Sequence, residues 1–312
     1  MQSPNFICNR PIMTDPLSEV IALLQPHSVL SKCISGAGRW GVRYAQFAQP
    51  SFAAVLEGSC LLAVDGQAAI TLEAGDFVLM PATPGFTMSG FEAATPEQIN
   101  PHSAHVPAGE VRHGLQSGPP DVRMLGGFFR FGSADSALLL SLLPALFHIR
   151  DVPRLAVLVG LVAEEATAQR AGRDLLLTRL VEVLLIEALR SSSHGDAPPG
   201  LLRGLADARL SVAMRHLHDD PARAWTVAEL AKKAALSRSS FFDRFTRAVG
   251  LAPMAYLLAW RMALAKDLLR RKECGLAEIA ERVGYASAST FSTAFSRYVG
   301  LPPSQYGNSA LA

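Results

Sequence analysis

Hydrophobic and polar positions change their period along the chain, and this change divides it into regions. Between residues 40 and 131, short apolar runs are separated by turn signals; Ser51–Val64 and Phe77–Met80 are two such runs, and Asp65-Gly66 is one such turn. Short strands at this close spacing predict an all-β barrel or sandwich. Residues 134–190 favour helices instead. There, apolar residues recur at steps of three and four, as at Leu177, Leu180, Val181, Leu184 and Ala188.

The rest of the chain is predicted to be helical after a short connection. Residues 191–200 read SSSHGDAPPG and contain nothing that could build a core, so they are expected to be a linker. From Leu205 the apolar spacing is helical almost to the end. We therefore expect an α+β chain with three parts. These are a β-barrel with appended helices over 1–190, a linker over 191–204, and an all-α domain over 205–312.

An internal repeat lies in the helical domain. The segment Gly250–Tyr256 recurs as Gly300–Tyr306, and the pair Phe241 and Phe245 recurs 50 residues later. Leu230-Ala231 recurs 49 residues later as Ile279-Ala280. One structural unit therefore occurs twice, with one residue added in the turn of the second copy.

Each copy predicts a helix-turn-helix unit, the first over 228–249 and the second over 276–299. In the first copy, Thr226 and Glu229 form a capping box that begins a helix, and Ser237 is a suitable N-cap for the next helix. In the second copy the turn is Gly284–Ala286 and the cap is Ser287. A helix, a tight turn and a second helix with one apolar face are typical of this motif.

A long helix is predicted between the copies, over Met254–Arg271, after Pro253. At 1.5 Å per residue it spans roughly 27 Å. Such a helix could hold two recognition helices near one turn of DNA apart, which is about 34 Å.

Charge is distributed unevenly along the chain. Hydrophobic residues make up 49% and charged residues 18%, which indicates a folded protein. The total net charge of +2 says little about partners. Residues 207–312, however, carry 15 Lys or Arg and 9 Asp or Glu, a net charge of +6. The basic excess therefore lies in the repeated domain, as expected for a domain that binds a polyanion.

The second copy resembles the AraC/XylS family of transcription regulators. The resemblance rests on Ile279-Ala280, Gly284-Tyr285, Ser287, Phe291, Phe295, Gly300, Pro303 and Tyr306, and it covers roughly residues 205–306. It implies a sequence-specific DNA-binding regulator rather than an enzyme. RNA polymerase is an expected partner.

The N-terminal region resembles the cupin-type sensor domain of one branch of this family. The resemblance rests on Phe52–Gly66, on Gly75-Asp76 with Pro81, and on Gly126–Arg130 followed by Leu142–Pro144. Enzymatic cupins bind a metal through histidines at two of these places. This chain has Ala53 and Ala54 near the first place and Phe86 near the second. We therefore expect neither a metal nor any other cofactor.

The predicted DNA contacts are the solvent faces of the two recognition helices. Small hydroxyls allow close approach to bases and phosphates, and arginines bind phosphates. The alternative is that these are ordinary solvated faces. The candidates are Arg238, Ser239, Phe242, Asp243, Thr246 and Arg247 in the first copy, and Ser289, Ser292, Thr293, Ser296 and Arg297 in the second.

A small-molecule or redox signal is expected to act on the barrel. The candidate effector contacts are the apolar residues Phe52, Val55, Phe77, Phe86 and Met88. Some relatives that sense reactive chlorine carry a cysteine near the position of Cys33, and Lys32 could lower the pKa of this thiol. The relatives' second cysteine would fall near Leu125-Gly126, where this chain has none. A structural or incidental thiol is therefore favoured.

Two further features have a functional and a structural interpretation. His102, His105 and His113 could bind a metal, but a polar surface loop is favoured. The helix over 174–190 could dimerise through Leu177, Val181, Leu184 and Ala188, or the same face could cover the barrel. We favour dimerisation and expect a homodimer.

The remaining expectations concern location and rival functions. The four cysteines form no CxxC pair, and the N-terminus has no secretory signal pattern. The longest apolar stretch, Ala137–Ile149, is too short for a bilayer. These observations fit a cytoplasmic protein without membrane contact.

One rival function is a cupin enzyme with a DNA-binding regulatory tail, and another is a constitutive DNA-binding protein whose barrel only dimerises. Neither the effector nor the target promoter nor the sign of regulation can be named from the sequence.

Overall fold

The structure, a computed structural model, forms two compact units. It describes residues 15–24, 26–47, 49–100, 110–131, 143, 145–168, 170–191, 199–272 and 274–309. Residues 23–206 and 246–251 form the barrel unit. Among the described residues, the helical unit contains those of 207–245 and 252–309 together with residues 15–22. The division at residue 207 lies close to the expected start of the helical domain at residue 205, but two segments differ from expectation. Helix α5 (Leu201–Ala206) occupies the end of the expected linker 191–204, and the N-terminal helix α1 (Pro16–Leu24) groups with the helical unit for most of its length.

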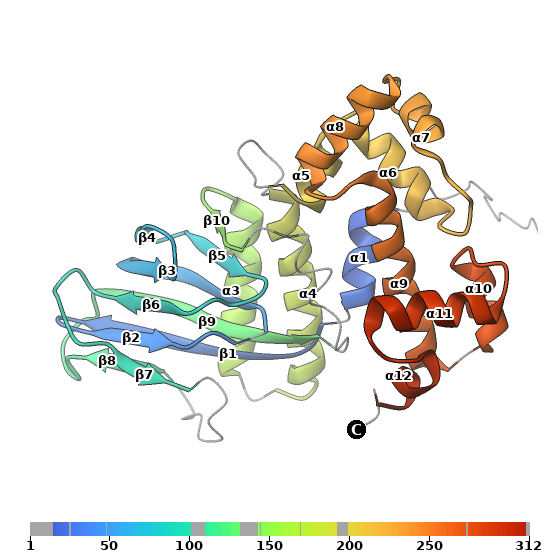
Figure 1. The fold of residues 1–312 in the computed structure, drawn as a ribbon. Coiled ribbons are helices and arrows are strands. Elements are labelled where there is room, and N and C mark those ends of the chain that lie inside the picture. The colour runs from blue at the N-terminus through green and yellow to red at the C-terminus, as the bar shows by residue number, and fades with distance from the viewer. Residues whose placement is uncertain are drawn as a thin grey trace, which may run out of the picture. The chain divides into compact units, whose positions relative to one another are not determined.

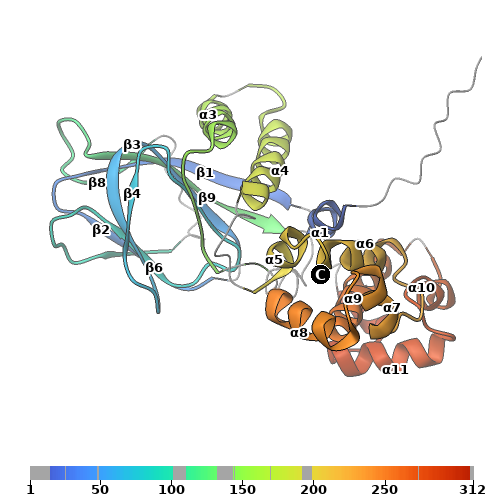
Figure 2. The same cartoon turned by 90° about the horizontal axis from the view of Figure 1, so that it is seen from above.

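The barrel unit contains one curled sheet of ten strands among the described residues (Figures 1 and 2). Its main path has the order β7-β2-β6-β3-β9-β1-β8, with β4 and β5 paired to β3, and β10 paired to β5. The sheet together with the helices confirms the α+β class, and the expected cupin-like barrel is a curled half-barrel. The strands are β1 (Pro26–Ala37), β2 (Gly41–Tyr44), β3 (Ser51–Val64), β4 (Ile70–Glu73), β5 (Phe77–Met80), β6 (Phe86–Ser89), β7 (Glu97–Ile99), β8 (Val111–Gly114), β9 (Val122–Phe131) and β10 (Phe147–Ile149).

Strand β3 turns the corner of the barrel. Its first half pairs with β5 and β9, and its second half pairs with β4 and β6. A register shift between Val55 and Glu57 marks the change, and Gly58 follows with a φ of +73°. A Cβ atom at Gly58 would lie 1.8 Å from the carbonyl oxygen of Asp121, so only glycine fits this bend.

Two helices, α3 (Pro153–Thr167) and α4 (Arg173–Ser191), pack against each other beside the sheet (Figure 2). Helix α4 also contacts β1 and β10. The side chains of Arg154 and Glu187 form an ion pair of 3.1 Å between the beginning of α3 and the end of α4. The barrel core beside them is built from buried residues of many strands, among them Trp40, Val55, Cys60, Leu62, Val78, Met80 and Met124. The short helix α5 (Leu201–Ala206) completes this unit.

The helical unit is built around the long helix α9 (Pro253–Arg271) (Figure 1). Its predicted extent, Met254–Arg271, was correct to within one residue. The other helices are α6 (Leu210–Asp219), α7 (Val227–Lys233), α8 (Arg238–Val249), α10 (Leu276–Arg282), α11 (Ala288–Val299) and α12 (Pro303–Ser309). The last four residues of α8 group with the barrel unit.

Helix α1 is tied to the helical unit by a histidine that the sequence did not single out. His218 of α6 is buried, its Nδ1 lies 2.7 Å from Glu19 Oε2, and its Nε2 lies 2.7 Å from the Tyr256 hydroxyl. Its ring also packs on Trp260 at 4.1 Å between centroids. Through Glu19, the N-terminal helix thus forms a polar contact with the buried His218 inside the helical unit.

No single helix in the described part of the chain is long and apolar enough to cross a membrane. Helices α8 and α9 pass that criterion only when taken together, and they are bent by 52° relative to each other.

Candidate nucleic-acid interface and ligand pocket

The two helix-turn-helix units repeat the same turn. In the first unit the amide of Leu236 donates to the carbonyl of Ala231 at 2.9 Å, and in the second the amide of Tyr285 donates to that of Ala280 at 2.8 Å. The residue before each donor has a positive φ, +52° at Ala235 and +78° at Gly284. The turns therefore align at the offset of 49, and the added residue is Ala286.

Each recognition helix begins at a serine, as predicted. The Oγ atoms of Ser237 and Ser287 accept the amides of Ser240 and Thr290, both at 3.2 Å. In α7, the predicted capping box of Thr226 and Glu229 is present. Each cap satisfies a backbone donor that the first turn of a helix leaves unpaired.

The interiors of the two units are also alike. Phe241 and Phe245 lie 5.5 Å apart between ring centroids, as do Phe291 and Phe295. Phe245 meets Tyr256 edge-on at 5.7 Å, and Phe295 meets Tyr306 edge-on at 5.5 Å. All four phenylalanines are fully buried. With this face buried, the opposite face of each helix is turned toward solvent.

A close backbone approach fixes the two helix-turn-helix units to each other. Gly284, in the second turn, has no room for a side chain because a Cβ atom there would lie 2.4 Å from the carbonyl oxygen of Ala222. Arg261 of α9 donates to the carbonyls of Pro221 and Arg223 at 2.7 and 2.9 Å. The loop before the first unit therefore touches both the central helix and the second turn. This packing role of Arg261 was not visible in the sequence.

Most predicted DNA contacts lie on the exposed faces of α8 and α11. The exposed ones are Arg238, Ser239, Phe242, Asp243, Arg247, Ser289, Thr293 and Arg297, and Ser292 and Ser296 are half-buried. Thr246 is a correction, because its Oγ1 atom is buried and has no hydrogen-bond partner. The residue as a whole is half-buried, and a hydroxyl that solvent cannot reach is not available to a base or a phosphate.

Helix α11 presents a shallow hollow that the sequence showed only in part. It is lined by the expected Ser289, Thr293 and Arg297, and also by Thr290, Ala294 and Tyr298. Leu258 of α9 forms another part of its wall. Thr290 and Tyr298 lie on the exposed side of α11 and could have been included from its helical period.

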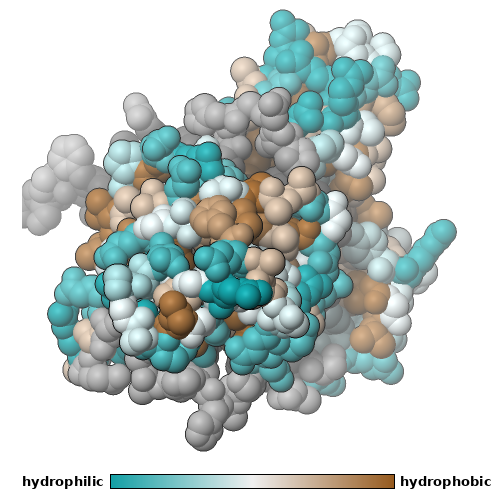
Figure 3. Space-filling model, turned by 90° about the vertical axis from the view of Figure 1, so that its left-hand side faces the viewer, coloured by the Kyte–Doolittle hydropathy of each residue, from teal (hydrophilic) through white to brown (hydrophobic). Residues whose placement is uncertain are grey.

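The barrel encloses a second candidate site, a cavity of about 350 Å³. Its walls are mainly apolar, and they include five phenylalanine or tyrosine rings and three methionine side chains. This volume is at the small end of the range for ligand pockets, roughly 300–1,000 Å³, and the apolar walls are typical of such sites. Figure 3 looks onto the barrel and shows hydrophobic positions near the middle of this face with hydrophilic ones around them.

Three of the five predicted effector residues line the cavity. Phe52, Phe86 and Met88 do so, together with Phe47, Met80, Met124 and Phe128. Val55 and Phe77 do not, and both are buried elsewhere in the unit. Phe77 packs on Phe52 with ring centroids 6.1 Å apart and pairs with Ile149 of β10. Strand positions alone could not show which apolar side chains border empty space.

The two edge strands of the sheet path approach each other beside this cavity. Nδ1 of His113 on β8 lies 3.7 Å from Oε2 of Glu97 on β7, and both residues line the cavity. Burial lowers the pKa of His113, and Glu97 partly offsets this effect. His113 therefore lies on a strand rather than in the expected surface loop. His102 and His105 lie outside the described residues, and the described residues contain no group of three possible metal ligands.

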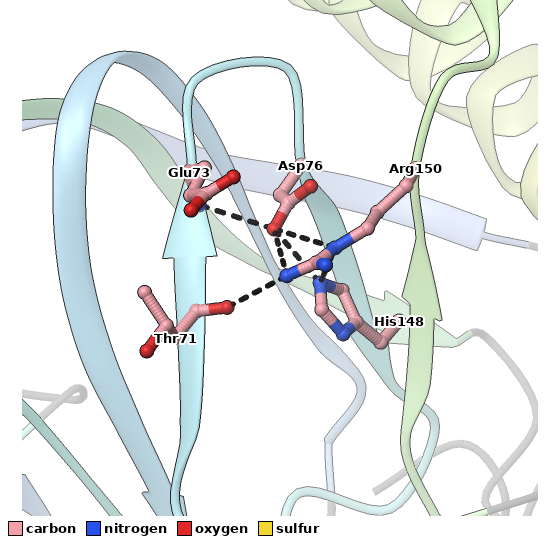
Figure 4. Close-up of polar contacts among 5 residues, drawn as sticks. All are labelled: Thr71, Glu73, Asp76, His148 and Arg150. Atoms are coloured by element: carbon pink, nitrogen blue, oxygen red, sulfur yellow. Dashed lines mark hydrogen bonds and ion pairs between the residues drawn. The ribbon is translucent and has the colours of Figure 1, made fainter.

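A polar cluster fastens β10 to the turn between β4 and β5 (Figure 4). Asp76 Oδ2 accepts the amide of Glu73 at 3.0 Å, and it lies 2.9 Å from His148 Nε2 and 3.2 Å from Arg150 Nε. Arg150 also donates to the carbonyl of Thr71 at 2.9 Å. Burial by itself would raise the pKa of Asp76, but the hydrogen bonds and the cationic neighbour hold it below its usual value. The carboxylate of the predicted Gly75-Asp76 motif thus has a structural partner on β10.

The surroundings of Cys33 do not activate its thiol. Burial and the nearby Glu110 raise the pKa of Cys33, with Arg123 only partly offsetting them. Lys32 was expected to lower this pKa, but it lines the cavity and does not contribute to the pKa shift of Cys33. Successive side chains of a strand point to opposite faces, so the sequence neighbours lie on different sides of β1. Cys33 pairs across the sheet with Leu125, near the predicted place of the second cysteine.

The residues expected to dimerise are buried inside the barrel unit. Leu177, Val181, Leu184 and Ala188 are between 0% and 3% exposed, because this face of α4 packs on α3 and the sheet. The exposed apolar residues of the helical pair are different: Val157 and Leu161 on α3, and Leu175, Leu176 and Val183 on α4. The choice of dimer face was therefore wrong, because α4 is apolar around much of its circumference.

Comparisons with known proteins match both units. A family described as Cupin matches residues 15–194, and one described as Helix-turn-helix domain matches residues 230–309. An AraC-like transcription regulator of Streptomyces lividans is 38% identical over 94% of this chain and 97% of its own length. One of Streptomyces antibioticus is 39% identical over 94% and 98%. The RCS-specific transcriptional activator RclR of Escherichia coli is 26% identical over 94% and 96%.

Proposed function

The chain belongs to the AraC-like family of transcription regulators, and on that premise we propose how its two units divide the work. Helices α8 and α11 read a promoter site on double-stranded DNA, and the barrel cavity takes a small-molecule effector. The observation that carries the DNA part is the duplicated unit. Two serine-capped helices expose arginine and hydroxyl side chains while their phenylalanine faces are buried.

The two exposed faces suit an asymmetric site. Arg238, Arg247 and Arg297 provide charge for phosphates, and such contacts make binding strongly dependent on salt. Helix α11 presents Ser289 and Thr293, whereas α8 presents Phe242 and Asp243 at its centre. Because side chains at base edges determine sequence preference, two different faces are expected to read two different half-sites.

A mobility-shift assay tests this assignment. The DNA probes are genomic fragments that the purified protein itself retains. Replacing Thr293 and Arg297 together by Ala should weaken binding at an unchanged melting temperature, and the Arg297 replacement alone should reduce the salt slope by about 1. Arg179→Ala on the barrel unit, an exposed arginine paired with Glu182, is the matched control. Unchanged binding by the double variant would contradict the assignment.

The cavity and the polar cluster suggest how an effector could act. Val78 and Met80 of β5 line the cavity, and β5 pairs with β10, which Asp76 holds through His148 and Arg150. Strand β10 ends at Ile149, and α3 begins at Pro153. A ligand that moves β5 would therefore shift the beginning of α3. If the free chain exchanges between two positions of α3, a ligand that binds one of them more tightly would change their populations, and this is sufficient for regulation.

A homodimer would use the exposed face of α3 and α4. Val157, Leu161, Leu176 and Val183 leave apolar side chains in solvent there, and large exposed apolar patches are typical of interaction sites. Size-exclusion chromatography of Leu176→Glu tests this face. If the wild-type chain is a dimer and the variant is a monomer, the result supports the proposed dimer face. RNA polymerase is a further proposed partner, and the cytoplasm is the proposed location.

An effector site is better supported than an enzyme or a redox sensor. Ala53 and Phe86 line the cavity where enzymatic cupins place metal histidines, so no cofactor is proposed. Cys33 has a raised pKa, which opposes oxidation through a thiolate. Stoichiometric iron or manganese in the purified protein would revive the rival cupin enzyme. If no ligand bound to the barrel, the remaining interpretation would be a constitutive DNA-binding protein.

A further inference from the structure

One wall residue of the mainly apolar barrel cavity, Lys32, carries a positively charged side chain. Lys32 lies on β1 two residues before Ile34, and both line the cavity. Its partner across the sheet is Gly126 of β9, which has no side chain and also borders the cavity. The lysine thus borders the same space as Phe47, Phe52 and Phe128.

Two other polar groups of the wall, those of Ser51 and His113, already have partners inside the protein. Ser51 Oγ accepts the hydroxyl of Thr83 at 2.7 Å, and His113 faces Glu97 at 3.7 Å. For Lys32, no hydrogen bond or ion pair is formed with any of the described residues. Burial lowers the pKa of Lys32, and no carboxylate offsets this effect. Water can still reach this half-buried ammonium, but an anion in the cavity would supply the counter-charge that the described residues do not provide.

We propose that the ligand of this cavity is a small apolar acid whose carboxylate pairs with the Lys32 ammonium while its hydrophobic body fills the space between the aromatic and methionine side chains. This inference rests on the proposed role of the cavity as the effector site. The ammonium gains a charge-assisted hydrogen bond, and the apolar body is removed from water. The carboxylate of Glu97 would repel a second anion near β7, which favours Lys32 as the anchor.

The proposal predicts selectivity for charge among molecules of the same shape. An acid should bind more tightly than the corresponding alcohol, because the alcohol leaves Lys32 without a counter-charge. A hydrogen bond to a charged group corresponds to an affinity ratio of about 10- to 100-fold. An amine of the same shape should not bind, since it would place two cations together.

Isothermal titration calorimetry on the full chain tests this prediction with two pairs of probes. They are 4-phenylbutanoate with 4-phenylbutan-1-ol, and decanoate with decan-1-ol, so that aromatic and aliphatic bodies are both sampled. At least one acid should bind, with its alcohol about 10- to 100-fold weaker. In Lys32→Met, the acid should lose this advantage while the alcohol binds as before, which also shows that the cavity is still folded. Lys32→Arg should retain the preference for the acid.

Two further variants separate the inference from the function on which it rests. Lys233→Met removes an exposed lysine of α7 and should leave acid binding unchanged. Ala53→Leu adds volume to the cavity wall and should weaken acid and alcohol alike. Equal binding of acid and alcohol, or acid binding that survives Lys32→Met, would overturn the role of Lys32 and leave the cavity as a binding site. If Ala53→Leu changed neither affinity, or if no probe bound, the cavity assignment would fail as well.

Discussion

The two helix-turn-helix units share one interior but present different surfaces. Phe241 and Phe245 in the first unit pack at the same ring distance as Phe291 and Phe295 in the second. The outer positions differ: the centre of α8 carries the exposed Phe242 and Asp243, whereas that of α11 carries the half-buried Ser292 and the exposed Thr293. Packing admits few solutions for the buried side chains of a small unit, whereas the solvent face is open to change. The comparison therefore separates what each unit needs to fold from what it would need to read DNA.

The units also differ at their turns and at one cap. Ala235 takes a positive φ in the first turn where the second has Gly284. The first helix of the first unit begins with the capping box of Thr226, whereas that of the second begins at Gly275 without a side-chain cap. Each unit thus has one local feature that is less favourable than its counterpart. The following changes test whether the two are equivalent in stability.

The largest expected effect is the loss of a buried phenyl ring. Phe295→Ala should lower the free energy of unfolding by about 3–5 kcal/mol, because a cavity replaces a side chain that packs on Phe291 and Tyr306. Phe245→Ala is the matched change in the first unit. Denaturant unfolding followed by circular dichroism measures both. Equal losses support equivalent interiors, and a normal unfolding curve for either would rule out its role as a core residue.

A smaller loss is expected at the second turn. Gly284→Ala should destabilise the helical unit by about 2–3 kcal/mol, because the new Cβ atom meets the carbonyl of Ala222 and alanine disfavours a positive φ. Ala235→Gly is the control in the first turn. It should change stability by less than about 1 kcal/mol, since relief of strain and the added chain entropy nearly cancel. Melting temperatures of the two variants decide the matter, and a harmless Gly284→Ala would contradict the close approach.

The smallest expected effects are at the helix caps. Ser237→Ala and Ser287→Ala should each cost about 1 kcal/mol, because each leaves the amide of Ser240 or Thr290 without its side-chain acceptor. Replacement by Asp should restore most of the loss, since Asp caps as well as Ser. Chemical denaturation of the four variants gives the comparison. A loss in only one unit would show that the two caps are not equivalent.

Helix, turn and strand positions in both regions could be predicted because they depend on local period and local caps. The second strand run, Phe77–Met80, and the recognition helices agree with their predicted ranges. The candidate DNA residues followed from the same period, and Thr246 failed because it lies at the boundary between the buried and exposed faces of α8. Period gives the direction of a side chain only to within the width of a helix face.

Contacts between distant segments could not be predicted in the same way. Helix α4 is apolar on several sides, so its sequence could not show that Leu177 and Val181 are buried while Leu176 and Val183 are exposed. The pairing of Asp76 with His148 and Arg150 joins residues more than 70 positions apart. No local pattern connects them.

By itself, the sequence determined the duplicated unit, its caps, its phenylalanine core and the β character of residues 40–131. These features arise from neighbours along the chain, whose spacing is set by backbone geometry. The tertiary structure alone decided that Lys32 borders a cavity while Cys33 does not, that Gly284 meets Ala222, and that α1 belongs to the helical unit. The physical reason is that empty space and close approach are properties of several segments packed together, and a residue's position in the chain does not specify them.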